Sequence, residues 1–202
     1  MLQVNWEQDY LASPPSLCFR NTTVCGQGNV PLYAINATAP THIQAGVRFA
    51  QVHDLRIVIK SSRHNYLGHS TVKNALLLWM HFLQNITFHD AFAGHGSAVT
   101  IGSGIPANAL YQAAKAHGKI FVGGTAATVA TATGYVQGGG HSRLSPTFGL
   151  ASDNTLEFQV VVTSGKLLTT NTREIHSSML SLSLTGERMR NRFVTAIFAP
   201  FD

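Results

Sequence analysis

The residue types with most capacity for chemistry gather in residues 128–153, TVATATGYVQGGGHSRLSPTFGLASD. Its three consecutive glycines, residues 138–140, allow a sharp turn or the close approach of a ligand, and His141 and Ser142 add polar side chains beside them. A lone run of three glycines is most often a tight hairpin turn. Residues 60–70, however, show the same mixture of glycine, histidine and small polar residues. Two such loops in one domain predict a shared ligand with a polyanionic part.

Other catalytic and metal-binding patterns fail on inspection. Ser142, His141 and Asp153 do not lie in a nucleophile elbow. The ten histidines show no HExxH motif and no paired helical spacing, so we expect no metal site. Cys18 and Cys25 lie close together without a histidine or acid at ligand spacing, and they form either a local disulfide in a secreted protein or two ordinary thiols.

Alternating strands and helices must position the two loops. Short apolar runs predict strands at residues 30–35, 55–59, 75–79, 88–92, 97–101, 120–122 and 156–163. Helical periodicity predicts one helix that starts at Thr41 as N-cap and ends at residues 53–54, and a second over residues 107–117 with Gly118 as its stop. This alternation is typical of an α/β or α+β domain.

Composition divides the chain into three parts. Residues 1–28 form an irregular lead-in broken by two prolines, and residues 29–165 carry the regular elements. Residues 166–202 are rich in serine and threonine, hold the basic cluster ERMRNR and lack periodicity. We therefore expect this last part to be a divergent and disordered tail.

Charge and hydropathy exclude several partners. The 202 residues are 45% hydrophobic and 11% charged, which favours a buried, loop-rich core. The net charge is +5, but the basic residues are scattered as far as residue 188, so we expect no nucleic-acid binding. We find no membrane-spanning run and no signal peptide, while sequons at Asn21, Asn36 and Asn85 only weakly favour secretion. The localisation stays open.

Four segments, in order from about residue 31 to about residue 165, carry a family resemblance: PLYAINATAPTHIQAGVRFA, LRIVIKSSRHNYLGHS, ANALYQAAKAHGKIFVGG and TVATATGYVQGGGHSRLSPTFGLASDNTLEF. Together they resemble the FAD-linked oxidases of the vanillyl-alcohol oxidase superfamily, and within it the berberine-bridge-enzyme-like branch common in fungal secondary metabolism. The resemblance implies an α+β fold of the PCMH type, with two α/β subdomains around FAD. It also implies hydride transfer from a small-molecule substrate to the flavin, and reoxidation by dioxygen.

The loop after the second strand usually reads like GHDYLGRS in such oxidases, and its histidine attaches the flavin. That histidine is His64 here, and a neutral imidazole is a suitable nucleophile toward a methyl carbon on the benzenoid edge of the flavin. The alternative is an ordinary exposed loop histidine. The resemblance also implies that the surrounding backbone binds the FAD pyrophosphate as an anion nest, through Ser61, Ser62, Asn65, Tyr66, Leu67 and Gly68.

The glycine-rich stretch matches positions that line the cofactor in such proteins, namely Thr128, Val129, Gly134, Gly139, Gly140 and His141. The alternative for these residues is a tight turn packed on the sheet. For His141, the sequence supports cofactor binding and the tight turn equally. Ala126 occupies the position of a cysteine that many relatives use for a second flavin bond, so the resemblance excludes that second bond here.

Several residues depart from the family pattern. Arg63 stands where the family usually has glycine, so we expect a bulky side chain against the flavin or an unfavourable φ. Asn65 and His69 replace an aspartate and an arginine, and Ala130 and Thr133 stand where glycines are common. Together these changes indicate relaxed constraint, weak FAD binding or an altered cofactor pose.

The family pattern stops near residue 165, where relatives continue into a substrate domain. We therefore expect the substrate domain to be missing, and we name no catalytic base or other catalytic residue. A second hypothesis follows, that of a truncated, non-catalytic flavin-binding remnant or an accessory partner of a full-length oxidase. A lone FAD domain would expose the apolar face that normally meets the substrate domain, which favours homo- or hetero-oligomers through that face.

Overall fold

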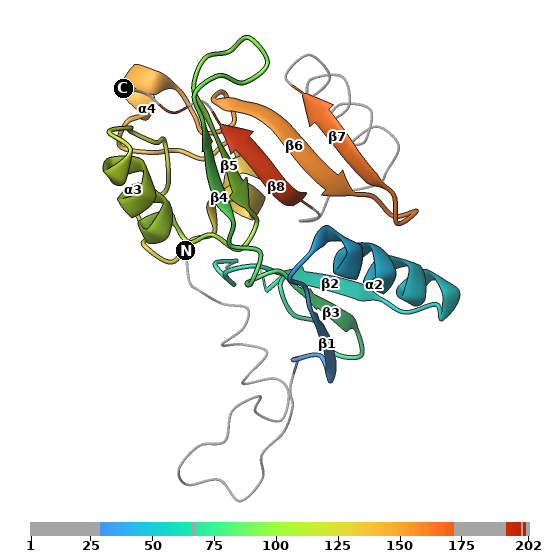
Figure 1. Cartoon of the computed structure of the whole chain (residues 1–202). Helices are drawn as coiled ribbons and strands as arrows, with labels where there is room; N and C mark the ends of the chain where they lie inside the picture. Colours follow the sequence, from blue (N-terminus) through green and yellow to red (C-terminus); the bar gives the residue numbers. More distant parts are fainter. Residues whose placement is uncertain (1–28, 66–67, 172–192, 199, 201–202) are drawn as a thin grey trace, which may run out of the picture.

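The computed structural model describes residues 29–65, 68–171, 193–198 and 200, which form two packed subdomains (Figure 1). The first contains three strands and one helix: β1 (Tyr33–Asn36), α2 (Pro40–Val52), β2 (Ile57–Lys60) and β3 (Leu76–Trp79). The second contains β4 (Ile86–His89), β5 (Ala98–Gly102), α3 (Ala107–Ala116), the π-helical turn η1 (Thr131–Tyr135), α4 (Ser145–Phe148), β6 (Thr155–Val161), β7 (Leu167–Asn171) and β8 (Phe193–Phe198). This arrangement confirms the α+β class.

The first subdomain is a parallel sheet in the order β1-β3-β2, with α2 packed on it. Ile43 and Val47 on the buried face of α2 share a core with Leu78 of β3. A Cβ at Gly46 would lie 2.6 Å from Leu78 Cδ2, so this glycine lets the helix approach the sheet closely. Parallel strands need crossover connections, and the connection from β2 to β3 carries the first group of predicted site residues.

The second subdomain is a five-stranded sheet in the order β4-β5-β8-β6-β7, and the pairs within it are antiparallel. Its core joins β5, α3, β6 and β8 through residues such as Ile101, Leu110, Phe158 and Phe198. Figure 1 shows α3 covering the side of the sheet formed by β4 and β5.

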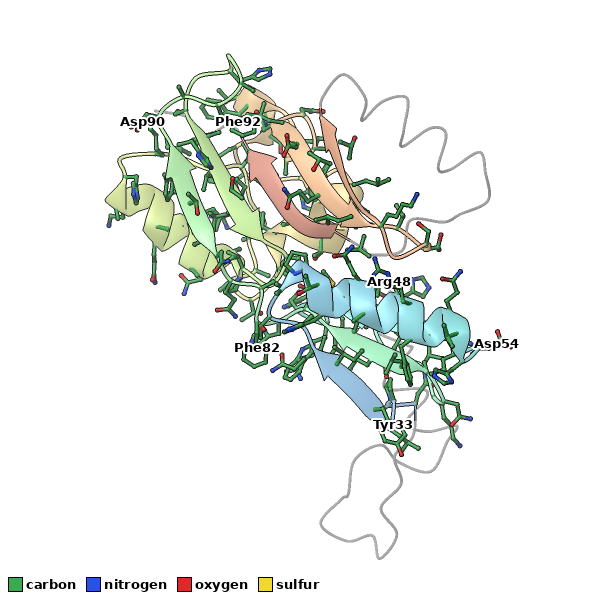
Figure 2. The ribbon with its side chains drawn as sticks, turned by 45° about the vertical axis from the view of Figure 1, so that its right-hand side comes forward. Tyr33, Arg48, Asp54, Phe82, Asp90 and Phe92 are labelled. Carbon is green, nitrogen blue, oxygen red and sulfur yellow. The ribbon has the colours of Figure 1, made fainter. Side chains whose placement is uncertain are left out.

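The two subdomains meet through α2. Val161 of β6 is buried in the same apolar cluster as Ile43 and Val47. Gln44 Nε2 and Arg48 Nη2 donate to the carbonyl oxygen of Gly165 in the β6–β7 turn, at 2.9 and 3.4 Å. Figure 2 shows Arg48 on the side of α2 that faces this turn. The helix is therefore packed between the two sheets.

Most predicted elements exist with shifted ends, and one predicted strand is absent. The first helix begins at Pro40 after Ala39, without a side-chain cap, because proline is favoured at the first helical position and Thr41 already lies inside the helix. Residues 120–122 are not a strand: Ile120 forms only an isolated bridge, while Phe121 and Val122 are buried in the core. A short buried apolar run looks the same in sequence whether it is paired or merely extended.

The segment after residue 165 also differs from the prediction. β7 pairs with β6, and β8 lies between β5 and β6, so parts of the expected tail belong to the second sheet. The boundary predicted at residue 165 therefore falls inside this sheet. The expected glycine-rich loop likewise contains the kinked turn η1, in which Ala132 and Thr133 have non-helical φ and ψ, and the short helix α4.

Candidate cofactor site

The two predicted loops meet at His64 and Thr128. His64 Nε2 lies 2.7 Å from Thr128 Oγ1, in a contact between residues that are 64 positions apart. Two residues earlier in the first loop, Ser62 Oγ accepts a hydrogen bond from the backbone N–H of Ala130 at 3.0 Å. The structure therefore joins the loop after β2 to the loop before η1 at two neighbouring points.

The first turn of α3 holds the segment that carries Thr128. The backbone N–H of Ala107 donates to the carbonyl of Val129 at 2.8 Å, and that of Asn108 donates to the carbonyl of Ala127 at 3.0 Å. Helix N-termini present N–H groups without intrahelical partners, and here the carbonyls on either side of Thr128 satisfy two of them. Thr128 is exposed but its backbone is fixed on both sides.

The loop after β2 also binds a third segment. Ser61 Oγ donates to the carbonyl of Ser103, which directly follows β5. Further along, the side-chain oxygen of Asn65 accepts from the N–H of His69 at 3.1 Å, and Gly68 has a φ of 70°. Predicted site residues Tyr66 and Leu67 lie outside the described residues.

The expected unfavourable φ occurs at Arg63, where φ is 63°. Its side chain is exposed. Within the described part of the chain, the backbone N–H groups of Ser62, Arg63 and His64 have no hydrogen-bond partner. A left-handed residue within a run of available N–H groups is typical of an anion-binding concavity.

Two positive charges accompany this loop. Burial, and then the nearby Arg63 guanidinium, lower the pKa of Lys60 at the end of β2. Lys60 Nζ lies 5.3 Å from the ring centroid of Trp79, a cation–π distance that offsets part of the cost of burying the ammonium. No ion pair with a carboxylate is recorded for either cation among the described residues, which favours an anionic ligand.

The glycine-rich turn packs around Tyr135. The Tyr135 hydroxyl donates to the carbonyl of His141 at 2.8 Å, and its ring lies so close to Gly140 that an added Cβ would meet Cε1 at 2.9 Å. Gly139 and Gly140 have φ values of 95° and 74°, conformations that glycine adopts without strain. Gly134 is exposed, and its carbonyl accepts from the N–H of Gly138.

The structure does not bring all predicted site residues together. Ser61, Ser62, His64, Thr128 and Val129 lie on segments joined by the hydrogen bonds above. In the residues that the structure describes, no hydrogen bond links the loop at residues 61–65 to the other predicted group: Gly134, Gly139, Gly140 and His141.

Two buried hydroxyl groups were not predicted from the sequence. Ser103 and Thr131 are fully buried, and neither Oγ atom has a partner among the described groups. Both residues lie on segments that the Ser61–Ser62 pair contacts, since Ser103 accepts from Ser61 and Thr131 follows Ala130. Buried polar atoms without partners are rare, and their position here fits a polar ligand with several acceptor atoms. The only sequence signal for Ser103 is its place between two glycines after a strand.

Two further observations concern metal-ligand groups and membrane-spanning helices within the described residues. No group of three or more His, Cys, Asp or Glu side chains is placed to hold a metal ion in that part of the chain. None of its helices combines the length and hydrophobicity needed to cross a membrane.

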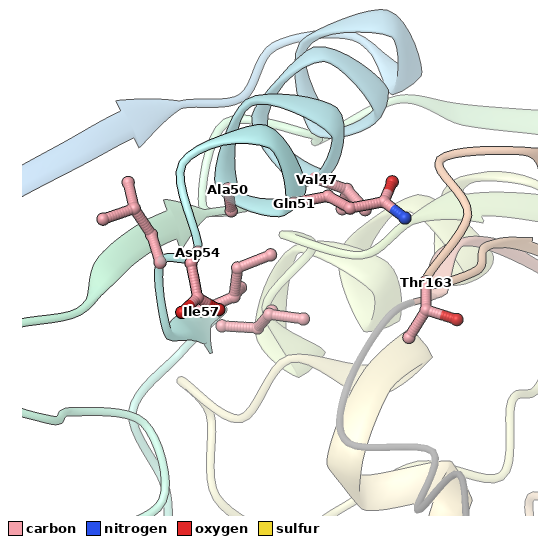
Figure 3. A pocket seen from close by; sticks show the side chains of 8 residues that line it. Val47, Ala50, Gln51, Asp54, Ile57 and Thr163 are labelled. Carbon is pink, nitrogen blue, oxygen red and sulfur yellow. The ribbon is translucent and has the colours of Figure 1, made fainter.

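A pocket lies beside α2 of the first subdomain. It is formed by the C-terminal half of α2, the chain leading into β2, and Thr163 (Figure 3). Five of its eight lining residues are apolar, including Ile57 and Ile59 of β2, and none of the eight belongs to the joined loops. This pocket is therefore separate from the joined loops.

Comparisons with known proteins agree with this geometry. A family model described as an FAD binding domain matches residues 31–171. The chain is 45% identical over 166 residues to the VAO-type flavoprotein oxidase VAO615 of Thermothelomyces thermophilus, covering 80% of this chain and 28% of that protein. It is 42% identical over 147 residues to the FAD-linked oxidoreductase patO of Aspergillus clavatus, covering 72% of this chain and 26% of that protein.

Solved structures show the same relationship. The crystal structure of the VAO-type flavoprotein MtVAO615 from Myceliophthora thermophila C1 has a TM-score of 0.80 and 39% identity, covering 89% of this chain and 33% of that one. The chain thus spans about a third or less of the length of these relatives. The family model covers most of the chain, and the joined loops with their unpaired polar groups fit FAD. The chain therefore belongs to the FAD-binding-domain family of VAO-type (PCMH-type) FAD-linked oxidoreductases, with FAD as its cofactor.

Proposed function

We propose that this chain is the FAD-binding part of an oxidoreductase that oxidises a small organic substrate in secondary-metabolite biosynthesis, with dioxygen as the electron acceptor. One observation carries the proposal: His64 and Thr128, on loops from different subdomains, are in hydrogen-bond contact beside the backbone N–H groups of residues 62–64. Bound FAD would supply the ability to accept a hydride.

The residues proposed to hold the pyrophosphate are those of the loop after β2. Its available N–H groups can donate hydrogen bonds to phosphate oxygens, and the nearby positive charges of Lys60 and Arg63 attract a polyanion. Ser61, Ser62, Asn65, Tyr66, Leu67 and Gly68 remain the proposed contacts from this loop.

The residues proposed to line the rest of the cofactor come from the second subdomain. They are the predicted Thr128, Val129, Gly134, Gly139, Gly140 and His141, to which we add Ser103 and Thr131. The buried hydroxyls of these last two residues have no partner in the described part of the chain, and a hydrogen-bonding ligand would satisfy them.

His64 is the proposed site of covalent attachment. Its imidazole is exposed at the junction of the two loops, as a nucleophile must be to reach a methyl carbon of the flavin. Ala126 still excludes a cysteinyl bond at its position. We assign no catalytic base, and the substrate remains defined only as a small organic molecule.

A second candidate function is a flavin-binding protein without turnover of its own, either a remnant or an accessory partner of a full-length oxidase. The observation that favours it is the share of the relatives' length that this chain spans, which is about a third or less. In this second candidate function, the chain forms homo- or hetero-oligomers through an exposed apolar face of the FAD domain.

The test of the cofactor proposal is direct. The expressed chain is precipitated with acid, and the washed pellet is examined for flavin absorbance and fluorescence, with His64→Ala as the control. Flavin retained by the wild type and released from the variant is the expected result. Absence of flavin from both the pellet and the native protein would refute FAD binding by this chain.

A further inference from the structure

We propose that the pocket beside α2 binds small organic ammonium ions, with the charged group at Asp54 and an apolar body against α2 and β2. This site is separate from the proposed cofactor site and does not depend on flavin binding. The pocket has a volume of about 300 Å³, at the lower end of the range for small-molecule sites. Both subdomains line it, because Thr163 follows β6, and such junctions are common places for ligand sites.

The apolar part of the pocket is built on buried residues. Val47, Ala50 and Ile59 are 5%, 2% and 9% exposed, and Val47 and Ile59 belong to the apolar cluster beneath α2. Ile57 and Leu55 complete this lining, and Leu55 is 41% exposed. Because packing in the core holds the wall in place, the pocket offers a preformed apolar surface to a ligand.

The way α2 ends places Asp54 at this pocket (Figure 3). The backbone N–H of Leu55 donates to the carbonyl of Ala50 at 2.8 Å, and Asp54 between them has a φ of 50°. This is a helix ending of the Schellman type, in which the left-handed residue is usually glycine or asparagine. Ala50 and Leu55 both line the pocket, so the same hydrogen bond fixes Asp54 beside the apolar wall.

A carboxylate at this position is unfavourable for two local reasons. A left-handed backbone suits glycine or asparagine better than aspartate, and the C-terminal end of a helix dipole repels negative charge. Within the described part of the chain, the Asp54 carboxylate has no recorded ion pair or hydrogen bond. A cation in the pocket would meet both the carboxylate and the negative end of α2.

The pocket favours an organic ammonium ion over an anion or a metal ion. Asp54 is the single acid in the lining and repels an anion. No group of three metal-ligating side chains occurs among the residues that the structure describes. The side-chain carbonyl of Gln51 is a second acceptor for ammonium N–H groups, and the apolar wall is stabilised when it buries the carbon body of the ligand.

The first experiment is an NMR titration of the ¹⁵N-labelled whole chain with 2-phenylethylammonium. We expect saturable shifts of the amide signals of Ala50, Leu55 and Thr163, and none for His64 or Thr128. The neutral alcohol 2-phenylethanol should bind about 3- to 5-fold more weakly, because it lacks the ion pair with an exposed carboxylate. Methylammonium, which lacks the apolar body, should bind at least about 10-fold more weakly. Absence of saturable shifts at the pocket, or equal affinity for the ammonium ion and the alcohol, would overturn the proposal.

The second experiment uses Asp54→Asn, which removes the charge, keeps the shape and suits the left-handed backbone. We expect about 3- to 5-fold weaker binding of 2-phenylethylammonium and unchanged binding of 2-phenylethanol. The matched control is Asp90→Asn, at an exposed acid that follows β4 in the other subdomain (Figure 2), and it should bind as the wild type does.

Urea denaturation excludes unfolding as the cause of weaker binding. Asp54→Asn should be at least as stable as the wild type, because the carboxylate is unfavourable at the end of α2. A variant less stable than the wild type would show that the carboxylate has a structural role, and it would contradict the proposal. Unchanged affinity of Asp54→Asn for 2-phenylethylammonium would contradict it as well.

Discussion

At the scale of single residues, Tyr135 shapes the glycine-rich segment. Its hydroxyl donates to the carbonyl of His141, and its ring fills the space left by the missing side chains of Gly124 and Gly140. Burial, and then the neighbouring Tyr111, raise the pKa of Tyr135 to about 12. Tyr111 itself donates to the carbonyl of Gly124 at 2.9 Å, so two phenols secure the backbone near the proposed cofactor.

The shifted pKa of Tyr135 predicts a pH dependence of stability. The unfolded chain ionises this phenol near its ordinary pKa of 10, and the folded chain near 12, so the folded state holds the proton longer. Its stabilising contribution is complete below pH 10 and is lost as the pH rises toward 12. Urea denaturation at pH 9 and pH 11 should show a smaller loss of stability in Tyr135→Phe than in the wild type. Tyr33→Phe, at an exposed site, is the control and should behave as the wild type.

The left-handed glycines give a matched pair of substitutions. Gly140→Ala forces a φ of 74° on a residue with a side chain, and its Cβ would meet Ala151 Cβ at 2.7 Å. Gly118→Ala has a φ of 66° but nothing within 4 Å. We expect Gly118→Ala to lower the free energy of unfolding by about 1 kcal/mol. Gly140→Ala should lower it by about 2–4 kcal/mol, because overpacking adds to the backbone strain. Equal losses in urea denaturation would show that the packing around Gly140 relaxes without cost.

At the scale of the elements, β8 has the greatest influence on the second subdomain. It pairs with β5 on one side and β6 on the other, although it comes from the last ten residues of the chain. Without it, β5 and β6 would each present an unpaired edge. Phe198 at its end is fully buried and meets Phe121 edge to face, with ring centroids 5.0 Å apart.

Truncation of the Phe198 side chain tests this placement of β8. Phe198→Ala removes a fully buried ring and should lower the free energy of unfolding by about 3–5 kcal/mol. Phe49→Ala, on the outer face of α2 where the side chain is 52% exposed, is the control and should cost about 1 kcal/mol or less. Urea denaturation of the two variants and the wild type measures both losses. A small loss for Phe198→Ala would contradict a position of β8 inside the sheet.

At the scale of the whole molecule, the proposed cofactor site lies where the two subdomains meet. The loop after β2 belongs to the first, while the segments around Ser103 and Thr128 belong to the second. A ligand that contacts both parts stabilises them together, since it binds the folded chain and not the unfolded one.

This arrangement predicts that FAD stabilises the protein through its dinucleotide part. In a His64→Ala chain, where binding stays reversible, FAD at about 100 times its Kd should raise the free energy of unfolding by about 2.7 kcal/mol. Riboflavin, which lacks the pyrophosphate, should add far less at the same concentration. Urea denaturation with each ligand measures the difference. Equal stabilisation by both ligands would contradict pyrophosphate binding by the loop after β2.

Much of the local structure and the chemical character of the site can be read from the sequence. The periodicity of residues 107–116 identifies α3, a β-branched run identifies β2, and a short apolar run identifies β3, because these signals depend only on neighbouring residues. The positive φ of 63° at Arg63 agrees with the family resemblance, since relatives usually have glycine at this position. The family resemblance also predicts His64 and Thr128 as site residues, and their roles toward FAD remain predictions.

Only the tertiary structure decided which of these residues meet and what surrounds them. Three features depend on segments that are far apart in the chain. They are the contact of His64 with Thr128, the position of β8 between β5 and β6, and the burial of the Ser103 and Thr131 hydroxyls. Strand order and loop contacts depend on the packing of α2 and α3 against their sheets, and no local pattern encodes that packing. The sequence by itself determined the elements, the candidate residues and the family resemblance, whereas long-range pairing determined the site.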